Sequence, residues 1–310
     1  MNPVKITVLI NQVGKRLDIL LSEQLPTYSR SFFKRLIADG QVMVNQQKMI
    51  KSGYLVRDND AITITFPVLN ASENIKLVQD VGVKILYEHS DFLIIFKPAG
   101  LVVHAPKNDY AGVTLVDWLV TYFTEISTVG SLDRPGIVHR LDMHTSGIMV
   151  IPRNNHSHAI FTDMFKNRQI SKTYLAIVSG HPAASGTINY HIVRHPTKRN
   201  IMTHVLTKDL GQNWNRQARE SLTNYEVLKY LNNYSLVAVK PVTGRTHQIR
   251  VHMAAIGHTL VGDTVYGYKN LIKPPLISRQ ALHAHKLEFV YQGQPYVFTC
   301  EAPDDFTALL

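Results

Sequence analysis

Residues 134–147 read RPGIVHRLDMHTSG, and an apolar run, IMVI at 148–151, follows directly. Within this stretch Asp142 lies close to Arg140, in a turn that leads into the predicted strand. A carboxylate in such a turn can be kept ionised by a nearby cation and used in catalysis. An isolated aspartate in a turn more often caps its own backbone. The stretch therefore indicates a candidate catalytic carboxylate, and the rest of the chain has to decide between the two interpretations.

Outward from this turn, strand-like and helix-like segments alternate without a regular βα repeat. The predicted strands are 92–97, 147–151, 173–178, 235–240, 286–291 and 296–300. The predicted helices are 115–123, 156–168 and 246–256. This mixture predicts an α+β fold with a largely antiparallel sheet. The glycine-rich loops typical of nucleotide binding are absent from the sequence, so no nucleotide cofactor is expected.

The first 66 residues predict a separate, small α+β unit. Leucines at helical spacing indicate a helix over 15–25, and a second helix is predicted between a cap at Ser29 and Gly40. Short alternating strands follow it. The polar arc of the second helix is basic, with Arg30, Lys34 and Arg35. These three side chains are interpreted either as a solvated face or as an RNA-docking face.

The predicted organisation is therefore two domains with a connection between them. Residues 1–66 form the first domain, and 83–310 form the second. Residues 67–82 open with a proline and show no periodicity, which is typical of a linker.

The composition favours a nucleic-acid partner. The chain has 310 residues, with 33 Lys+Arg against 23 Asp+Glu and a formal net charge of +10. Basic side chains gain affinity for RNA by releasing counterions from phosphates, although excess charge also serves solubility. The single cysteine, Cys300, excludes an intramolecular disulfide. With neither a secretory segment nor a membrane-spanning stretch in the sequence, we predict a soluble, cytoplasmic protein without a membrane partner.

Several motifs together resemble one family. The stretch around Asp142 resembles the HRLDxxTSG motif of the RluA-type RNA pseudouridine synthases. Four further segments match motifs of that family in the same order: residues 96–104 (FKPAGLVVH), 172–174 (KTY), 244–252 (GRTHQIRVH, continuing to Tyr266-Gly267) and 280–284 (QALHA). The first 66 residues separately resemble an S4 RNA-binding domain.

The resemblance implies isomerisation of uridines in RNA to pseudouridine, by an α+β catalytic domain with a long, mainly antiparallel mixed sheet crossed by a basic cleft. It implies that Asp142 is the catalytic residue and that Tyr174 lies against the target uracil. It also implies that Arg250 lies within ~4 Å of the Asp142 carboxylate. Arg140 would enter the RNA beside the extruded base, with His139 next to it as a further RNA contact. An S4 domain favours large-subunit ribosomal RNA as the substrate, with transfer RNA as the alternative.

The chemistry requires no cofactor, because isomerisation conserves every atom and the redox state. Asp142 could attack C1′ of the sugar, remove a sugar proton, or stabilise a cation-like intermediate, and the sequence leaves these routes open. The 15 histidines include close pairs, but none has the spacing of a metal site, so no metal is expected.

Two other functions are weighed against this one. A non-catalytic RNA-binding or ribosome-assembly protein would use the first domain and the basic cleft alone. A hydrolase of glycosidic bonds would need a second carboxylate about 5–10 Å from Asp142, for which Asp263 and Asp133 are the candidates. The sequence departs from the family pattern at Met143-His144, Gln46 and Ala105, and over the loop-like stretch 195–220. These departures bear on the choice of RNA target, and contact of that stretch with substrate stays open.

Overall fold

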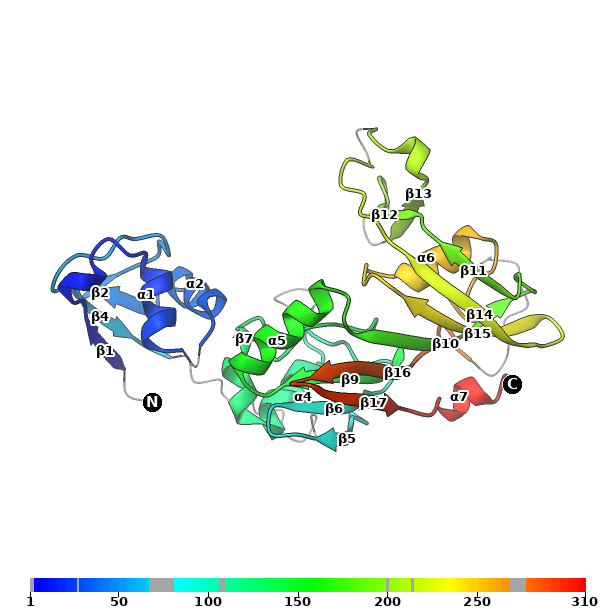
Figure 1. Ribbon diagram of the computed structural model, residues 1–310, viewed down its shortest axis with the longest axis horizontal. Helices are drawn as coiled ribbons and strands as arrows, with labels where there is room; N and C mark the ends of the chain where they lie inside the picture. The colour runs from blue at the N-terminus through cyan, green and yellow to red at the C-terminus, as the bar shows by residue number, and fades with distance from the viewer. Residues whose placement is uncertain are drawn as a thin grey trace.

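The structure is a computed structural model, and it describes residues 3–26, 28–66, 78, 81–105, 110–198, 201–212, 215–267 and 277–310 (Figure 1). Most of the predicted linker lies outside the described residues. No helix among the described residues is long and apolar enough to cross a bilayer.

The N-terminal residues form a small antiparallel sheet covered by two helices. Its elements are β1 (Val4–Thr7), η1 (Ile10–Gln12), α1 (Leu17–Gln24), α2 (Arg30–Ala38), β2 (Val42–Val44), β3 (Gln47–Lys48) and β4 (Ala61–Ile64), with strand order β1-β4-β2-β3. The second helix begins where the sequence predicts, because the Ser29 side chain accepts the N–H of Phe32 at 3.1 Å. Apolar side chains of both helices are buried against the sheet.

A nine-stranded sheet dominates the rest of the chain. Its strands are β5 (Lys84–Glu88), β6 (Phe92–Lys97), β9 (Ser146–Pro152), β10 (Ser171–Ser179), β11 (Ser185–Ile188), β14 (Thr223–Tyr230), β15 (Tyr234–Pro241), β16 (Leu282–Tyr291) and β17 (Gln294–Thr299). The order is β11-β14-β15-β10-β16-β9-β6-β5, and β17 pairs with β16. Every pairing is antiparallel except β9 with β16, which is parallel over two residue pairs. This is the α+β fold with a mainly antiparallel sheet that the sequence predicts.

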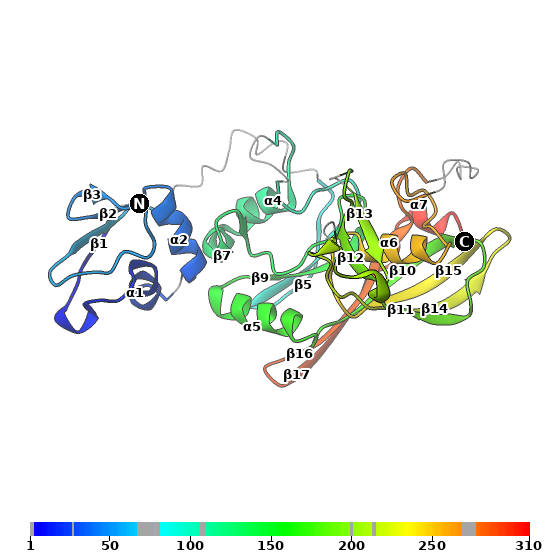
Figure 2. The same ribbon diagram turned by 90° about the horizontal axis from the view of Figure 1, so that it is seen from above.

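Helices cover both faces of the central strands. Alternate residues of β6 face opposite sides: Leu93 and Ile95 pack with α4 (Leu115–Tyr122), while Phe92 and Ile94 pack with α5 (Asn155–Lys166). Figure 2 shows these two helices on either side of the sheet. Burial on both faces explains why residues 92–96 are apolar without alternation.

A third helix and a hairpin complete the region around the cleft. Helix α6 (Gln248–Ala255) packs through Ile249 and Met253 on β10 and β15. The hairpin of β12 (His191–Arg194) and β13 (Met202–Val205) lies beside α6 (Figure 1). The expectation of a loop over 195–220 is therefore wrong in part, since this stretch contains β13 and η3 (Thr207–Asp209). The predicted strands do not include β5, β11, β12 or β14. The residues of β5 and β14 are mostly exposed and give little apolar signal, and β11 and β12 have only four residues each.

The remaining elements are short: η2 (Thr124–Thr128), β7 (Gly130–Ser131), β8 (Arg134–Pro135) and α7 (Asp304–Thr307). Helix α2 of the N-terminal unit contacts β7, which pairs with β8 in a separate two-stranded sheet. The Ser29 hydroxyl donates to the Gly130 carbonyl, and Arg35 lies 3.8 Å from Asp133. The N-terminal unit thus borders one end of the cleft described next.

Candidate active site

A basic cleft crosses the sheet between α5 and α6. Its volume is about 980 Å³, and its walls come from the 134–145 segment, α5, β10 and the 241–250 segment. The charged lining residues are mostly cationic: Arg134, Arg140, Lys166, Arg168, Lys172, Arg245 and Arg250, against Asp142 and Asp163. Such a surface suits a polyanion.

Asp142 begins a tight turn at the floor of this cleft. The Thr145 N–H donates to the Asp142 carbonyl at 3.0 Å, which closes the turn just before β9. Gly147 follows at φ +128°, and a side chain there would meet the Ala284 carbonyl at 2.3 Å. Only glycine therefore allows β9 to approach β16 at this point, which fixes where the turn lies.

Lys97 supports this turn through backbone carbonyls. Its side chain is fully buried, and Nζ donates to the carbonyls of Pro98, Leu101 and Met143 at 2.7, 2.8 and 3.1 Å. Burial lowers the pKa of Lys97 to about 7, although the charge of Asp142 opposes the shift. Since Met143 directly follows Asp142, this lysine holds the backbone beside the carboxylate.

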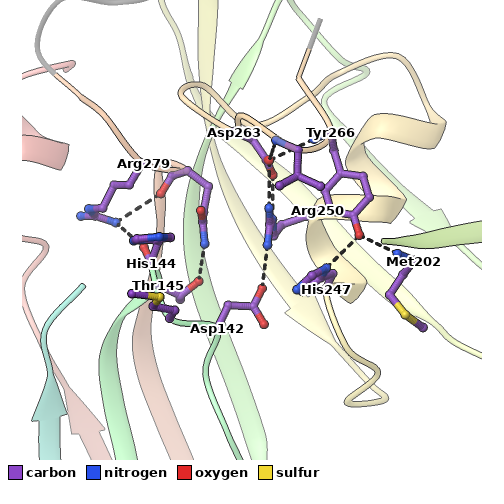
Figure 3. A network of polar contacts seen from close by, with 12 residues as sticks. Asp142, His144, Thr145, Met202, His247, Arg250, Asp263, Tyr266 and Arg279 are labelled. Atoms are coloured by element: carbon purple, nitrogen blue, oxygen red, sulfur yellow. Dashed lines mark hydrogen bonds and ion pairs between the residues drawn. The ribbon is translucent and has the colours of Figure 1, made fainter. Parts of the chain in front are cut away.

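Arg279 also supports this turn. Nη1 donates to the His144 carbonyl at 3.2 Å (Figure 3), and the guanidinium is bound by Asp305 of α7 at 2.6 and 2.8 Å. The C-terminal helix thereby fixes an arginine that contacts the turn.

Arg250 lies between two carboxylates. Nη1 donates to Asp142 Oδ2 at 3.3 Å, while Nε and Nη2 donate to the two oxygens of Asp263 at 2.7 and 2.9 Å (Figure 3). Burial alone would lower the pKa of Arg250, but both carboxylates raise it above its ordinary value, so the guanidinium is charged. The expected contact of Arg250 with Asp142 is present, and Arg250 also forms a shorter ion pair with Asp263.

Tyr174 lies in β10 between the two apolar clusters that flank the cleft. It pairs with Val239 and Ala284, next to a register shift between Thr173 and Tyr174. Burial raises the pKa of its phenol, and the charge of Asp142 adds to that effect. The side chain therefore keeps its proton and offers an aromatic face rather than a phenolate.

Comparison with known proteins identifies the family. The family model described as RNA pseudouridylate synthase matches residues 91–255, and the S4 domain model matches residues 15–62. An uncharacterised RNA pseudouridine synthase of Aquifex aeolicus is 37% identical over 95% of this chain and 92% of its own length. The chain belongs to the RNA pseudouridine synthase family. The ribosomal large subunit pseudouridine synthase D of Escherichia coli is 35% identical to this synthase over 98% of the chain and 92% of that relative.

Solved structures agree with this membership. Human RNA pseudouridylate synthase domain containing 1 superposes on this synthase with a TM-score of 0.58 at 29% identity. The match covers 72% of this chain and 84% of the human one. The human domain containing 4 gives a TM-score of 0.59 at 25% identity, over 76% and 94% of the two chains.

The predicted site residues of the synthase fall into two groups. Asp142, Tyr174, Arg250, Arg140 and His139 all line the cleft. Arg140 is exposed and makes no hydrogen bond or ion pair within the described part of the chain. It can therefore reach a bound RNA.

The His139 ring is held by the protein itself. Nε2 accepts the Val150 N–H at 3.0 Å, and the ring stacks on Phe165 with centroids 4.6 Å apart. Burial lowers the pKa of His139 to about 3, so the ring is neutral and adds no charge to the cleft. These contacts give it a role in fixing the 139–141 segment, and a contact with RNA stays a prediction.

The basic residues of α2 lie outside the cleft lining. Nε of Arg30 donates to the buried Asp18 at 2.9 Å, and Arg35 pairs with Asp39 at 2.9 Å. Lys34 is exposed, and the described residues offer it no hydrogen bond or ion pair. Of the three cations, Lys34 is the one whose charge no acidic side chain offsets.

The two carboxylates considered for a hydrolase do not face the cleft. Asp263 is fully buried, and its oxygens accept from Arg250 and from the N–H groups of Val265 and Tyr266. Burial would raise the pKa of Asp263, but these donors hold it below its ordinary value. Asp133 lies instead at the contact with Arg35. Asp263 does lie within about 10 Å of Asp142, since both bind Arg250, which is the distance that a hydrolase would need. Its buried oxygens are already occupied by donors, however, so the hydrolase is not favoured.

The sequence patterns predict no role for Lys97, Arg279 or Tyr266, and they offer Asp263 only as the second carboxylate of a hydrolase. Lys97, Asp263 and Tyr266 stand inside segments that resemble family motifs, which is the available signal. Contacts such as that of Lys97 with Met143 join distant parts of the chain, which local patterns do not report. Among the described residues, no group of three or more His, Cys, Asp or Glu side chains is placed to hold a metal ion.

Proposed function

We propose that this synthase isomerises uridines of large-subunit ribosomal RNA, with Asp142 as its catalytic residue. The proposal rests on one contact: the buried guanidinium of Arg250 lies 3.3 Å from the carboxylate of Asp142, which is partly exposed in the basic cleft. The full-length relatives named ribosomal large subunit pseudouridine synthase D support the choice of RNA. We place the reaction in the cytoplasm, with RNA as the macromolecular partner.

The residues of the cleft suit the steps of the reaction. The C1′–N1 bond of the target uridine must break, the base must turn, and C5 must join C1′. Extruding the nucleotide costs a few kcal/mol of free energy, and contacts of Arg140 with the RNA offset part of it. The ring of Tyr174 stacks on the extruded base, a contact of about 1–3 kcal/mol. Asp142 then acts at the sugar, and Arg250 keeps its carboxylate charged and oriented.

The two parts of the chain have different tasks in this proposal. Residues 83–310 carry the catalytic cleft, and residues 1–66 dock on structured RNA. The contact of Ser29 with Gly130 brings the N-terminal unit to the rim of the cleft. RNA bound by that unit can therefore continue into the cleft.

Pseudouridine mapping tests the proposal. Total RNA is compared between cells with the gene, without it, and with Asp142→Asn in its place. We expect at least one position of large-subunit ribosomal RNA to lose pseudouridine in the second and third strains. Loss confined to transfer RNA would overturn the ribosomal substrate. Full modification by Asp142→Asn would overturn the assignment of the catalytic residue.

A further inference from the structure

His247 is a second polar side chain of the cleft, next to the catalytic pair. It is the residue before α6, whose first turn carries Arg250, and it adopts a left-handed conformation at φ +56°. A residue other than glycine is uncommon in that conformation and calls for an explanation. The imidazole lines the cleft together with Asp142, and Figure 3 shows both side chains near Arg250.

One ring nitrogen of His247 is fixed by a chain of hydrogen bonds. The Met202 N–H donates to the Tyr266 hydroxyl oxygen at 2.9 Å, and that oxygen lies 2.8 Å from His247 Nδ1 (Figure 3). Since the backbone N–H already supplies a donor to this oxygen, the hydroxyl proton is free to go to Nδ1. With this arrangement every proton of the chain has an acceptor. The opposite arrangement leaves the hydroxyl proton without an acceptor among the described residues.

Tyr266 is itself held rigidly by the Arg250 pair. Its N–H donates to Asp263 at 3.1 Å, and the Arg250 guanidinium lies 4.9 Å from its ring centroid. The hydroxyl therefore has a fixed position relative to Arg250 and His247. A rigid acceptor of this kind fixes the tautomer of a histidine through its other nitrogen.

The consequence is an N–H group at Nε2. The described residues offer Nε2 no partner. Burial lowers the pKa of His247; Asp142 and Asp263 oppose the shift, and Arg250 and Arg140 add to it. The ring is thus neutral near pH 7 and presents one donor and no charge. A neutral donor suits an uncharged carbonyl acceptor better than a phosphate, for which the cleft already holds many cations.

We propose that His247 recognises the extruded base, with its Nε2–H donating to a carbonyl oxygen of the uracil ring. The inference rests on the proposed reaction at Asp142, because only a base turned into this cleft comes within reach of Nε2. A donor facing C4 would also disfavour cytosine, which carries an amino group there in place of a carbonyl.

Two variants of His247 separate recognition from folding. Asparagine tolerates the left-handed conformation, so His247→Asn preserves the start of α6, but its shorter side chain does not reach the position of Nε2. His247→Gln carries an amide N–H closer to that position. His181→Asn is the control, since His181 lies outside the cleft lining and bonds the Leu231 carbonyl.

The test combines these variants with altered substrates. A stem-loop RNA carries uridine, 2-thiouridine or 4-thiouridine at the target position, because a thiocarbonyl is a weaker acceptor. We expect His247→Asn to lower kcat/KM for uridine about tenfold, the size of one lost hydrogen bond. We expect His247→Gln to regain part of that loss and His181→Asn to match the wild type. One of the two thio substitutions should slow the wild type and have no further effect in His247→Asn.

The proposal would be overturned if the effects of the thio substitutions and of His247→Asn on kcat/KM were additive. If both thio substitutions slow His247→Asn by the same factors as the wild type, Nε2 does not contact a base carbonyl. Asp142→Asn on the same stem-loop separates this failure from that of the proposed function. An inactive Asp142→Asn with additive thio effects removes only the role of His247, whereas an active Asp142→Asn moves the reaction out of this cleft.

Discussion

Asp142 and Asp263 bind the same guanidinium from different edges. Asp263 accepts hydrogen bonds from Nε and Nη2 of Arg250 at 2.7 and 2.9 Å, and Asp142 accepts one from Nη1 at 3.3 Å. The bidentate pair is buried on both sides, whereas the Asp142 side chain is 18% exposed. Asp263 therefore fixes the plane of the guanidinium. Asp142 receives one donor in a fixed direction, and its other oxygen has no hydrogen bond within the described residues.

Asp263→Asn is expected to affect both stability and catalysis. Removing one partner of a buried ion pair costs about 3–5 kcal/mol, because the remaining charge loses its compensation. Here Asp142 compensates in part, so we expect the lower end of that range, together with a fall in kcat of at least about a hundredfold. Urea unfolding and single-turnover assays on a stem-loop measure the two effects. Glu23→Gln, in an exposed pair with Lys15, should change the free energy of unfolding by less than about 0.5 kcal/mol. An unchanged kcat in Asp263→Asn would show that the orientation of Arg250 is not needed.

Arg250→Lys tests the geometry of the guanidinium. Lysine keeps the charge but cannot donate to Asp263 through two nitrogens and to Asp142 through a third. We expect a loss of kcat of about tenfold or more with little change in RNA affinity, and a larger loss for Arg250→Ala. Comparing kcat with Kd for the same RNA checks this split. Equal activity of the lysine variant and the wild type would mean that charge alone suffices.

Lys97→Met is expected to remove a pH dependence of stability. Burial holds the pKa of Lys97 at about 7 in the folded state, against 10.5 as its ordinary value. Between these two values the unfolded chain binds a proton that the folded chain does not. The contribution of Lys97 to stability therefore rises with pH over this window, by up to about 1.4 kcal/mol per pH unit, and is lost as pH falls to 7.

The measurement is the difference in unfolding free energy between wild type and Lys97→Met at several pH values. We expect the unfolding free energy of the wild type to increase relative to that of the variant from pH 7 upward, and the difference to change little below pH 7. Lys51→Met, at an exposed position, is the matched control. Parallel curves for wild type and Lys97→Met would contradict the prediction.

The cations of α2 are expected to differ in their effects. Lys34→Gln should leave folding intact and reduce the slope of log K against log salt for structured RNA by about 0.7–0.9, as for one phosphate contact. Arg30→Gln should instead destabilise the N-terminal unit, since it removes one of the two arginines bound to the buried Asp18. Salt titrations and thermal unfolding distinguish these outcomes. An unchanged salt slope for Lys34→Gln would place the docking face elsewhere.

The local pattern of the sequence determined the elements with strong apolar or capping signals. Residues 92–97 form a strand with the predicted bounds, because a short apolar run suits a strand buried on both faces and is too short for an ordinary helix. Ser29 starts α2 because its hydroxyl accepts a backbone N–H three residues on, which is a short-range interaction. The motif around Asp142, in order with the others, also sufficed to indicate the family.

The tertiary structure alone decided what surrounds Asp142, the carboxylate that we propose as catalytic. Lys97 donates a hydrogen bond to the Met143 carbonyl, and Arg279 donates one to the His144 carbonyl; both contacts join segments far apart in the chain. Asp263 binds the Arg250 guanidinium that contacts Asp142. Sequence patterns report burial and local hydrogen bonding, which depend on near neighbours. Contacts between distant segments depend on how the whole sheet packs, and in this protein they fix the turn that carries Asp142.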